Sequence, residues 1–539
     1  MKMHKGNILV LAVAAVLALG GCKGGGEQTG KLDISSEPVM TENAMPITEN
    51  PVTLSCWTMN LSQGYAKSYN DFEAFQILKE KTGVELKFIH PTGGAPDEQL
   101  GVMIASDDLP DLVFHTWHTK WKKEIENGTF LTLNDYIDKW APNFRHALEQ
   151  YPEYQKFYYN VYNGKAVAFP TLVGDNDRFL CWDGYFIRKD WLDKVGMQMP
   201  NTIEEWEAVL RAFCEKDPNG NGKKDEIGFS TFDFQALYVF MPAFDVARYD
   251  YFISPTTGKV THAILEPRFK EYLQTMNRWY QDGLINSNYL STTGKELDAM
   301  VLNNELGAFH SDNNNSMPKY MQANPEMELV AAPYVRSSDG KRYYSYPNIK
   351  KGVRDRGVLI SSKCQHIKEA VRYLDYMYSD EASTLMNWGV KGDTFDTDAQ
   401  GNKYFTDFIM KNPDGKTPYE AICKYMTNTG FAGYNSSLAA EALEANLPEK
   451  VKATKAQSVE YARETEKDWL IDLLPTTAEE DAEILSYSAD LDTYLSEMYN
   501  RFIMGLEPLD AYDAFVEKAK SIGIEKVIAI KQAAYDRIK

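Results

Sequence analysis

The stretch Val52-Thr-Leu-Ser-Cys-Trp57 opens the folded part of this 539-residue chain and predicts a strand. A helix-like stretch from about residue 69 to 81 follows it, and Val84–Ile89 then alternates apolar and polar residues over its first five positions, which predicts a second strand. A helix from about residue 98 to 105 leads to a third strand at 110–114. Strands that alternate with helices form βαβ units, so the sequence predicts an α/β fold with a parallel sheet.

A polar stretch further along, Asp217-Pro-Asn-Gly-Asn-Gly-Lys-Lys-Asp-Glu226, has the spacing of a calcium loop. Asp217, Asn219 and Asn221 occupy positions 1, 3 and 5 of that pattern, and Gly222 stands at position 6, where the tight turn needs a glycine. A full EF-hand has a bidentate Glu at position 12, but a glycine stands there, so this is not an EF-hand. The alternative is a polar turn that follows a helix and binds nothing.

Two runs before this loop complete a family resemblance. They are Arg188–Gly196 (RKDWLDKVG) and Pro200–Trp206 (PNTIEEW). With the loop they resemble the family 1 extracellular solute-binding proteins of ABC importers, and most of all the lipoprotein branch that includes the alginate-oligosaccharide-binding proteins. Weaker similarity lies at Ser379–Ser383 and Asn387–Gly392. The resemblance implies a two-lobe periplasmic-binding-protein-like α/β fold (class II type) with a helical C-terminal extension.

The resemblance also implies a structural calcium ion, because in that branch a calcium loop follows this helix. Ca²⁺ takes six to eight oxygen ligands from a short, curved loop. Carried over residue by residue, the implied ligands are Asp217, Asn219, Asn221, Lys223 (through its carbonyl), Asp225 and Glu226.

The N-terminus has the pattern of a lipoprotein signal peptide over residues 1–21. Lys2 and Lys5 precede the apolar run Ile8–Leu19, which is too short to span a bilayer comfortably. The sequence Leu19-Gly-Gly-Cys22 resembles a bacterial lipobox, which implies a lipid on Cys22 and anchoring at the extracytoplasmic face of the cell membrane. An ordinary secreted protein is the alternative. Residues 22–51, rich in Gly, Ser, Pro and acids, are predicted to be a flexible tether.

The rest of the chain is divided on the same basis. We expect an N-terminal lobe of residues 52–168 plus part of 305–365, and a C-terminal lobe of 169–304 plus 366–539 that includes the helical extension. The formal net charge of −20 argues against a surface for nucleic acid or an anionic membrane. Apart from Cys22 the chain has five widely scattered cysteines, which suggest buried side chains rather than a disulfide framework.

A receptor for sugars needs aromatic rings for the ring faces and polar groups for the hydroxyls. Ligands of open α/β sheets bind beyond the carboxyl ends of strands, where the first two tryptophans of the set stand. The candidates for ligand binding are Trp57, Trp117, Trp182, Asp183, Tyr185, Asp312 and Trp388. For each aromatic residue the alternative is a place in the core.

The sequence therefore predicts a monomeric, lipid-anchored receptor that binds a carbohydrate, foremost an oligosaccharide, and delivers it to ABC transporter permease subunits. The chain has no G-x-S-x-G, H-E-x-x-H or P-loop motif, so it is not expected to be an enzyme. Two alternatives stay open: a secreted carbohydrate-active enzyme, and a receptor for another solute such as a peptide.

Overall fold

The structure is a computed structural model that describes residues 34–60, 66–92, 96–117, 121–173, 183–231, 234–247, 251–312, 316–344, 353–423, 425, 431–466, 468–471 and 474–539. The chain divides into two compact units, residues 1–37 and residues 38–539. In the first unit, the described residues 34–37 include a turn in which the Glu37 amide donates to the Ile34 carbonyl oxygen at 3.0 Å. Everything below concerns the second unit.

A six-stranded mixed sheet organises the first lobe, with the order β14-β4-β11-β3-β1-β2. Its strands are β1 (Val52–Thr58), β2 (Val84–Ile89), β3 (Leu112–Thr116), β4 (Phe169–Leu172), β11 (Val353–Ile360) and β14 (Gly433–Tyr434). β1 pairs in parallel with β2 and with β3, which confirms the predicted βαβ units, whereas β11 runs antiparallel to both β3 and β4. The connection from β1 to β2 turns at Gly83, which ends the intervening helix with a φ of +76° that favours glycine.

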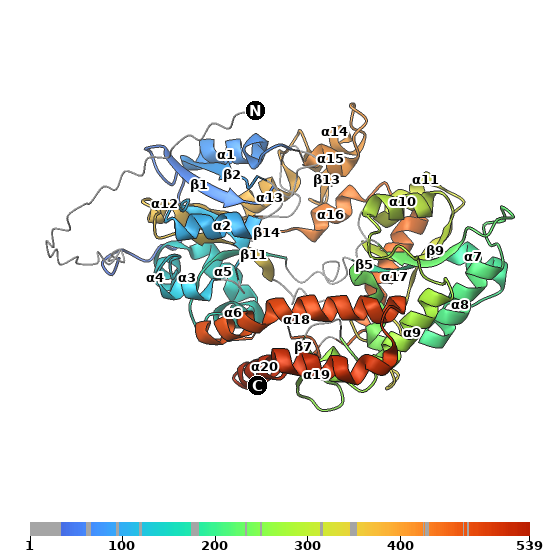
Figure 1. Ribbon diagram of the computed structural model, residues 1–539. Helices are drawn as coiled ribbons and strands as arrows, with labels where there is room; N and C mark the ends of the chain where they lie inside the picture. The colour runs from blue at the N-terminus through green and yellow to red at the C-terminus, as the bar shows by residue number, and fades with distance from the viewer. Residues whose placement is uncertain are drawn as a thin grey trace, which may run out of the picture. The chain divides into compact units, whose positions relative to one another are not determined.

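Helices from two distant parts of the chain surround this sheet (Figure 1). The first set is α1 (Glu73–Thr82), α2 (Pro96–Ala105), α3 (Lys122–Glu126), α4 (Asn134–Trp140), α5 (Pro142–Gln150) and α6 (Pro152–Asn160). The second set is α12 (Ile367–Tyr376), which packs on α4, α5 and β11, and α13 (Asp380–Trp388), which packs on α1 and β14. Residues from 366 onward were expected to belong to the C-terminal lobe, which is wrong for α12, α13 and β14 because they belong to the first lobe. The C-terminal lobe was also expected to begin at residue 169, which is wrong because β4 is a strand of the first sheet.

The second lobe contains a four-stranded sheet with the order β10-β5-β9-β6. Its strands are β5 (Asp183–Arg188), β6 (Ile227–Thr231), β9 (Leu306–Asp312) and β10 (Leu329–Ala332). The helices of this lobe are α7 (Lys189–Val195), α8 (Ile203–Glu215), α9 (Phe269–Gln281), α10 (Gly294–Leu302), α11 (Ser316–Ala323) and α17 (Glu449–Arg463). Of the segments 305–365 that were expected to return to the first lobe, β11 does so, whereas β9 and β10 pair with β5.

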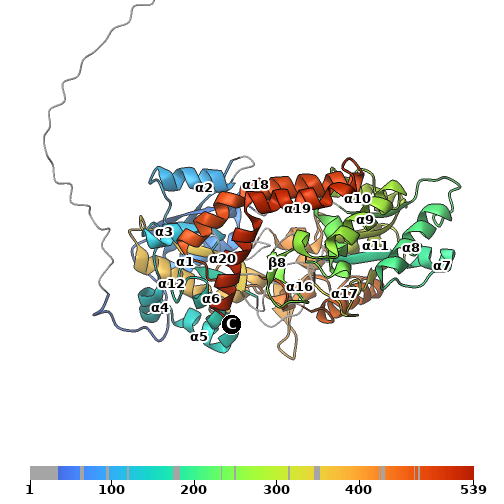
Figure 2. The ribbon, with the colours of Figure 1, turned by 60° about the horizontal axis from the view of Figure 1, so that its bottom comes forward.

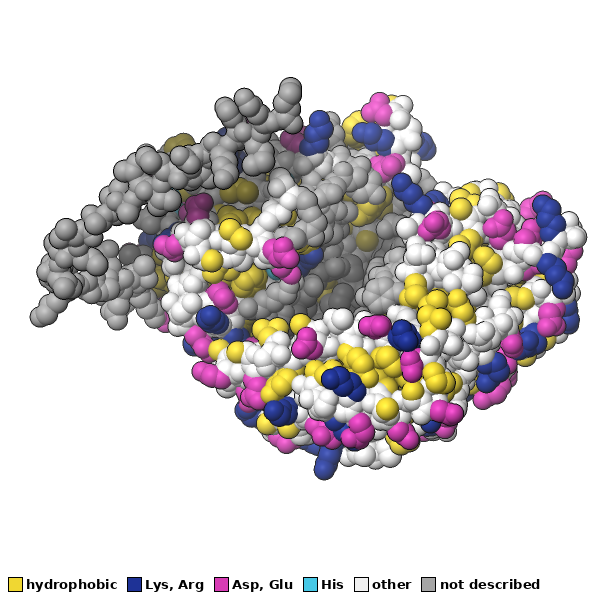
Figure 3. Space-filling view, viewed as in Figure 1, with side chains coloured by type: hydrophobic (Ala, Val, Ile, Leu, Met, Phe, Trp, Pro, Cys, Tyr) yellow, Lys and Arg dark blue, Asp and Glu magenta, His cyan; other side chains and the backbone are white. Residues whose placement is uncertain are grey.

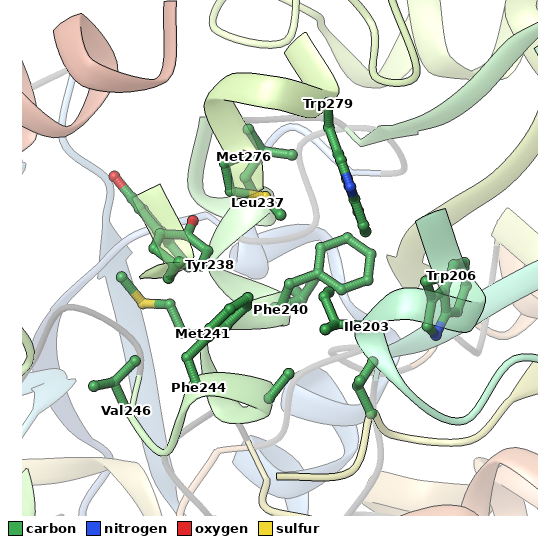
Figure 4. Close-up of a cluster of buried hydrophobic side chains, with 14 of the residues drawn as sticks. Ile203, Trp206, Leu237, Tyr238, Phe240, Met241, Phe244, Val246, Met276 and Trp279 are labelled. Atoms are coloured by element: carbon green, nitrogen blue, oxygen red, sulfur yellow. The ribbon is translucent and has the colours of Figure 1, made fainter. Parts of the chain in front are cut away.

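The core of the second lobe forms where α8, α9 and the 3₁₀ segment η3 (Phe234–Phe244) meet (Figure 4). A capping box begins α8: the Thr202 hydroxyl accepts from the Glu205 amide, and the Glu205 carboxylate accepts from the Thr202 amide. The apolar face of α8 then buries Trp206 against Phe240, with ring centroids 5.5 Å apart, and Phe240 contacts Trp279 of α9 at 5.1 Å. Burial of this apolar surface holds the helices on the sheet.

The helical extension consists of α18 (Ala478–Met504), α19 (Tyr512–Ile522) and α20 (Ile524–Asp536). The capping box of α18 is formed by Thr477 and Glu480. At 27 residues α18 is about 40 Å long at 1.5 Å per residue. Figures 1 and 2 show that α18 and α19 run side by side, and α18 also packs on α9 of the second lobe.

Short elements complete the described chain. They are the hairpin β7 (Tyr251–Ile253) and β8 (Val260–His262), the hairpin β12 (Phe395–Thr397) and β13 (Lys403–Phe405), the helices α14 (Asp407–Met410), α15 (Pro418–Ile422) and α16 (Ser437–Leu443), and the 3₁₀ turns η1 (Tyr69–Asp71), η4 (Ala263–Leu265) and η5 (Leu509–Ala511). Of the cysteines that the structure describes, three are buried and Cys214 is half-buried, and all four are free thiols.

The segment before β1 differs from the prediction. Residues 40–48 were expected to belong to a flexible tether, but the Met40 amide donates to the Lys139 carbonyl oxygen at 2.8 Å, and the Ile47 amide donates to that of Thr82 at 2.9 Å. The predicted end of the tether at residue 51 is therefore wrong, because this segment is bound to the first lobe.

The surface carries charges of both signs. On the face shown in Figure 3, acidic and basic side chains are interspersed over the described residues. No helix of the described chain is both long and apolar enough to cross a membrane.

Candidate ligand and calcium sites

The carboxyl ends of β1 and β3 lie side by side, because Trp57 pairs with Val113 and Thr58 with Phe114 in the parallel ladder. His115 lies within β3, one residue before its end, and its Nε2 lies 2.9 Å from the Asp97 carboxylate of α2. The His115 side chain is 7% exposed and its ring centroid is 5.5 Å from that of Trp57. A buried imidazole beside a carboxylate is thus placed at the end of the sheet where ligands of open α/β folds bind.

The neighbouring polar groups hold the loops at this end of the sheet. His90 Nε2 accepts from the Tyr69 amide at 3.1 Å, so Nδ1 carries the hydrogen that is donated to the Thr58 carbonyl oxygen at 2.8 Å. The side-chain amide of Asn60 (Nδ2) donates to the carbonyl oxygens of Ala66 and Lys67 at 2.9 and 3.0 Å. These side chains fix the backbone after β1 and β2.

The predicted aromatic residues of the first lobe are buried. Trp57 is 1% exposed, and Trp117 is 0% exposed, with its ring tilted against Tyr158 at 5.4 Å. Trp388 is also buried, and its ring stacks on Phe405 at 4.9 Å in a small core around the β12–β13 hairpin. In this conformation none of the three rings offers a free face to a sugar, so the structure supports the core alternative for them.

Tyr185 of the second lobe is buried as well. Its hydroxyl donates to the Val239 carbonyl oxygen, and its ring lies 5.9 Å from Trp206 and 5.6 Å from His310. Trp182 lies outside the described residues. A ligand contact by Tyr185 or Trp182 stays a prediction.

Asp183 and Asp312 are brought together by the second sheet, although they are 129 positions apart in sequence. The antiparallel ladder of β5 and β9 pairs Asp183 with Asp312 and, two positions further, Tyr185 with His310. Thr231 of β6 also pairs with His310. The side chains of the two aspartates lie outside the described part, so their role in binding stays a prediction. His115 and His310 are not among the ligand residues predicted from the sequence, although His115 comes directly after the strand predicted at 110–114.

The loop that follows α8 has the turns that its glycines predict. Asp217 takes the left-handed conformation with a φ of +46°, and Gly220 and Gly222 both have a φ of +73°. The Asp217 carboxylate accepts from the amides of Asn221 at 3.1 Å and Gly222 at 3.0 Å. The side-chain oxygen of Asn221 in turn accepts from the Lys223 amide at 2.7 Å. The chain is thereby curved around its own polar side chains.

The two asparagines of the loop point their amide groups at one carboxylate. Asn219 Nδ2 donates to Asp225 Oδ1 at 3.0 Å, and Asn221 Nδ2 donates to both oxygens of Asp225 at 3.0 Å. These hydrogen bonds, the one from Asn219 foremost, lower the pKa of Asp225. The loop is also bound to its surroundings, since Lys194 donates to the Pro218 carbonyl oxygen at 2.6 Å.

Glu226 closes the loop, and its Oε1 is buried without a hydrogen-bond partner. Burial raises the pKa of this carboxyl, and the nearby charges of Asp217 and Asp225 raise it further. A buried carboxylate oxygen without a partner is costly. A divalent cation beside Glu226 would offset both the burial of this carboxyl and the negative charges of Asp217 and Asp225.

The oxygen-bearing groups of this loop fit calcium, which accepts amide and main-chain oxygens, better than they fit a metal that is held by acidic side chains alone. Within the described residues, no three His, Cys, Asp or Glu side chains are grouped closely enough to hold a metal by themselves. Calcium ligation here would need the asparagine and main-chain oxygens in addition to the acids. Rotating the amides of Asn219 and Asn221 would turn oxygen instead of nitrogen toward Asp225, because the two ends of the amide have nearly the same shape.

Comparison with known proteins agrees with this architecture. The sequence model of the bacterial extracellular solute-binding proteins matches residues 60–384. The fructooligosaccharide ABC transporter substrate-binding protein FusA of Streptococcus pneumoniae serotype 4 is 25% identical to this chain. The alignment is 558 positions long, gaps included, and covers 99% of this chain and 98% of FusA.

Two solved structures have the same fold. The crystal structure of the alginate-binding protein AlgQ2 without calcium ion matches with a TM-score of 0.75 at 24% identity, over 92% of this chain and 100% of AlgQ2. An EF-hand mutant of FusA from S. pneumoniae in complex with fructo-nystose matches with a TM-score of 0.72 at 23% identity, over 90% of this chain and 99% of that one. The chain described here belongs to the family of bacterial extracellular solute-binding proteins.

Proposed function

We propose that this protein is the substrate-binding component of an ABC importer and that its solute is an oligosaccharide, bound between the two lobes and delivered to the permease. The observation that carries the proposal is the 25% identity with a fructooligosaccharide-binding receptor over 99% of the chain. The two-lobe architecture supports it, because receptors of this kind close two domains around the solute. Titration of the protein with a panel of oligosaccharides tests it directly.

The ligand residues belong to this proposal. The described groups at the ends of the strands are His115 with Asp97 in the first lobe and His310 in the second, while Asp183 and Asp312 stand opposite each other in the ladder. Carboxylates and imidazoles bind sugar hydroxyls well because they offer strong hydrogen-bond acceptors and donors. Trp182 joins them as a ring that could stack on a sugar. The protein would bind its solute and release it chemically unchanged, because a transport receptor does not catalyse a reaction.

Calcium is proposed as a structural ion of the loop at residues 217–226. The buried Oε1 of Glu226, the nearby charges of Asp217 and Asp225, and the positive φ of Gly222 support it. The FusA structure that carries an EF-hand mutation indicates that a relative has a calcium-type loop. The ion would stabilise the turn after α8 and take no part in solute binding.

The lipid anchor at Cys22 is proposed from the sequence alone. Cleavage after residue 21 and acylation of the Cys22 thiol would hold the receptor at the outer face of the membrane. Mass spectrometry of the N-terminal peptide from the native host tests this proposal, with a diacylglyceryl mass on Cys22 as the expected result.

A further inference from the structure

The segment of residues 40–48, which we call the strap, is bound to α12 by one arginine. Arg372 Nε donates to the Asn43 side-chain oxygen at 3.1 Å, Nη1 to the Ile47 carbonyl oxygen at 2.7 Å, and Nη2 to the Ala44 carbonyl oxygen at 2.7 Å. Three hydrogen bonds from one guanidinium fix the direction of the strap as well as its position, because the guanidinium donors form a rigid planar set.

A buried carboxylate binds the same part of the strap. Asn43 Nδ2 donates to Asp375 Oδ2 at 3.1 Å and to the Arg372 carbonyl oxygen at 2.6 Å. Asp375 is fully buried, and it also accepts from Asn143 Nδ2 at 2.8 Å and from the Phe144 amide at 2.9 Å. One carboxylate therefore joins the strap to α12 and to the first turn of α5.

Both ends of the strap are held by main-chain hydrogen bonds. At the first end, the Met40 amide donates to the Lys139 carbonyl oxygen, and the Met40 carbonyl oxygen accepts from Arg145 Nη2 at 2.9 Å. At the other end, the Ile47 amide donates to the Thr82 carbonyl oxygen at 2.9 Å. A side chain at Gly83 would collide with the Thr48 carbonyl oxygen, so the close approach of the two backbones requires glycine. The strap thus runs from α4 and α5 to the end of α1 and is bound to α12 between them.

We propose that the strap is a clamp that shortens the membrane tether and fixes the point at which it leaves the receptor, beside α4 and α5. This inference rests on the proposed lipid anchor at Cys22. With the clamp closed, the 17 residues 23–39 join the lipid to the first lobe, and with it open the 29 residues 23–51 do so. The upper limit of reach is about 60 Å for 17 residues and about 100 Å for 29 residues, the lengths of fully extended chains.

The shorter tether has a consequence for delivery. The effective concentration of a tethered module depends on the length of its tether, so opening the clamp would change the concentration of receptor at the permease. A fixed exit point also restricts which face of the receptor turns toward the membrane. The strap would therefore act on how often and in what orientation the receptor meets its permease, and not on solute affinity.

Hydrogen exchange of the lipidated full-length protein in nanodiscs tests the clamp. The amides of residues 40–48 should be protected in the wild type, and Arg372→Ala should accelerate their exchange about tenfold or more while the rest of the first lobe is unchanged. Arg501→Ala, which removes a hydrogen-bonded arginine of α18 far from the strap in sequence, is the control and should leave the strap protected. Asn43→Ala should act like Arg372→Ala and leaves every helix intact, so it carries the test if Arg372→Ala fails to fold. Wild-type amides that exchange as fast as those of an unstructured peptide would overturn the proposal.

Energy transfer from a dye on the first lobe to a dye on a lipid then measures the distance between the receptor and the membrane surface. Transfer should be lower for Arg372→Ala than for the wild type and for Arg501→Ala. Equal transfer in all three would contradict the shortening of the tether even if the strap is protected. Mass spectrometry of the same samples separates this failure from that of the anchor, because an unmodified Cys22 would refute the anchor and leave the exchange result standing.

Discussion

Lys122 of α3 and Asp481 of α18 form an ion pair with 3.0 Å between Nζ and Oδ2, and the side chain of Lys122 is 8% exposed. Lys122 also donates to the hydroxyl of Thr476. The other end of the same helix is buried in the second lobe, where Asn277 of α9 donates to the carbonyl oxygens of Phe502 and Ile503 at 3.1 Å. Helix α18 is thus fixed to the first lobe at its first turn and to the second lobe at its last (Figure 2).

We predict that Lys122→Met lowers the free energy of unfolding by about 1–3 kcal/mol, because it leaves Asp481 partly buried beside an apolar side chain. The double variant Lys122→Met/Asp481→Asn should lose less than the two single variants together, as residues in direct contact do. Urea unfolding of the four proteins measures the coupling. Additive losses would show that the pair does not act as a unit.

Removal of calcium should lower the thermal stability of the protein. An ion present at a hundred times its dissociation constant stabilises the folded state by about 2.7 kcal/mol, so chelation should lower the melting temperature by a measurable amount. Asp225→Asn should abolish the response to chelation. Asp398→Asn is a matched control, because Asp398 also accepts from amides of its own exposed loop but lies outside the proposed site. A wild-type melting temperature that exhaustive EDTA treatment does not change would refute the calcium proposal.

The Glu207 carboxylate should stabilise the second lobe in a way that acid removes. Arg278 foremost, with Trp279 and Arg211, donates to it and lowers its pKa to about 2. A pKa lowered in the folded state contributes stability above the unfolded value near 4.5 and loses it as the pH falls toward 2. Glu207→Gln should therefore cost about 1–2 kcal/mol at pH 7, and the difference from the wild type should shrink as the pH falls below 4.5. Glu460→Gln, in an exposed ion pair with Arg463, should cost less than about 0.5 kcal/mol. A cost of Glu207→Gln that is the same at pH 7 and pH 3 would contradict the assignment.

Asp375 should have the opposite pH dependence. Burial raises its pKa to about 6, although the amides of Phe144 and of the two asparagines favour the ionised form. The folded state then binds a proton that the unfolded state has already lost between about pH 4 and pH 6, so this group makes stability fall as the pH rises through that window. Asp375→Asn should remove this slope, which urea unfolding at pH 4, 5, 6 and 7 would show. Identical slopes for the wild type and the variant would contradict it.

Local structure followed from local sequence where the decisive interactions lie within one element. The alternation in Val84–Ile89 predicted β2, and Gly222 predicted the tight turn of the loop, where its φ is positive. The pair Thr202 and Glu205 likewise has the spacing of the capping box that begins α8. Each of these signals depends on backbone geometry or on hydrogen bonds a few residues apart.

The failures concern partners that are distant in sequence. The sequence of α12 has an apolar face, which includes Ala370, Val371 and Leu374, but an apolar face does not determine which sheet a helix will cover. The strap was taken for tether because its polar, proline-containing sequence lacks a core, and its partners Arg372 and Asp375 are about 330 positions away. Trp57 and Trp117 stand at strand ends as expected, yet the direction of a ring depends on helices such as α6, whose packing the sequence does not reveal.

The measurement that tests the central claim most directly is calorimetric titration of the purified protein, with calcium present, against neutral and acidic oligosaccharides, followed by analysis of the recovered sugar. The account predicts saturable binding of one class of oligosaccharide at one site per chain, with the sugar recovered unchanged. A sugar that is recovered cleaved would show an enzyme instead, and the absence of binding to every oligosaccharide, together with binding of a peptide, would contradict the carbohydrate-receptor proposal.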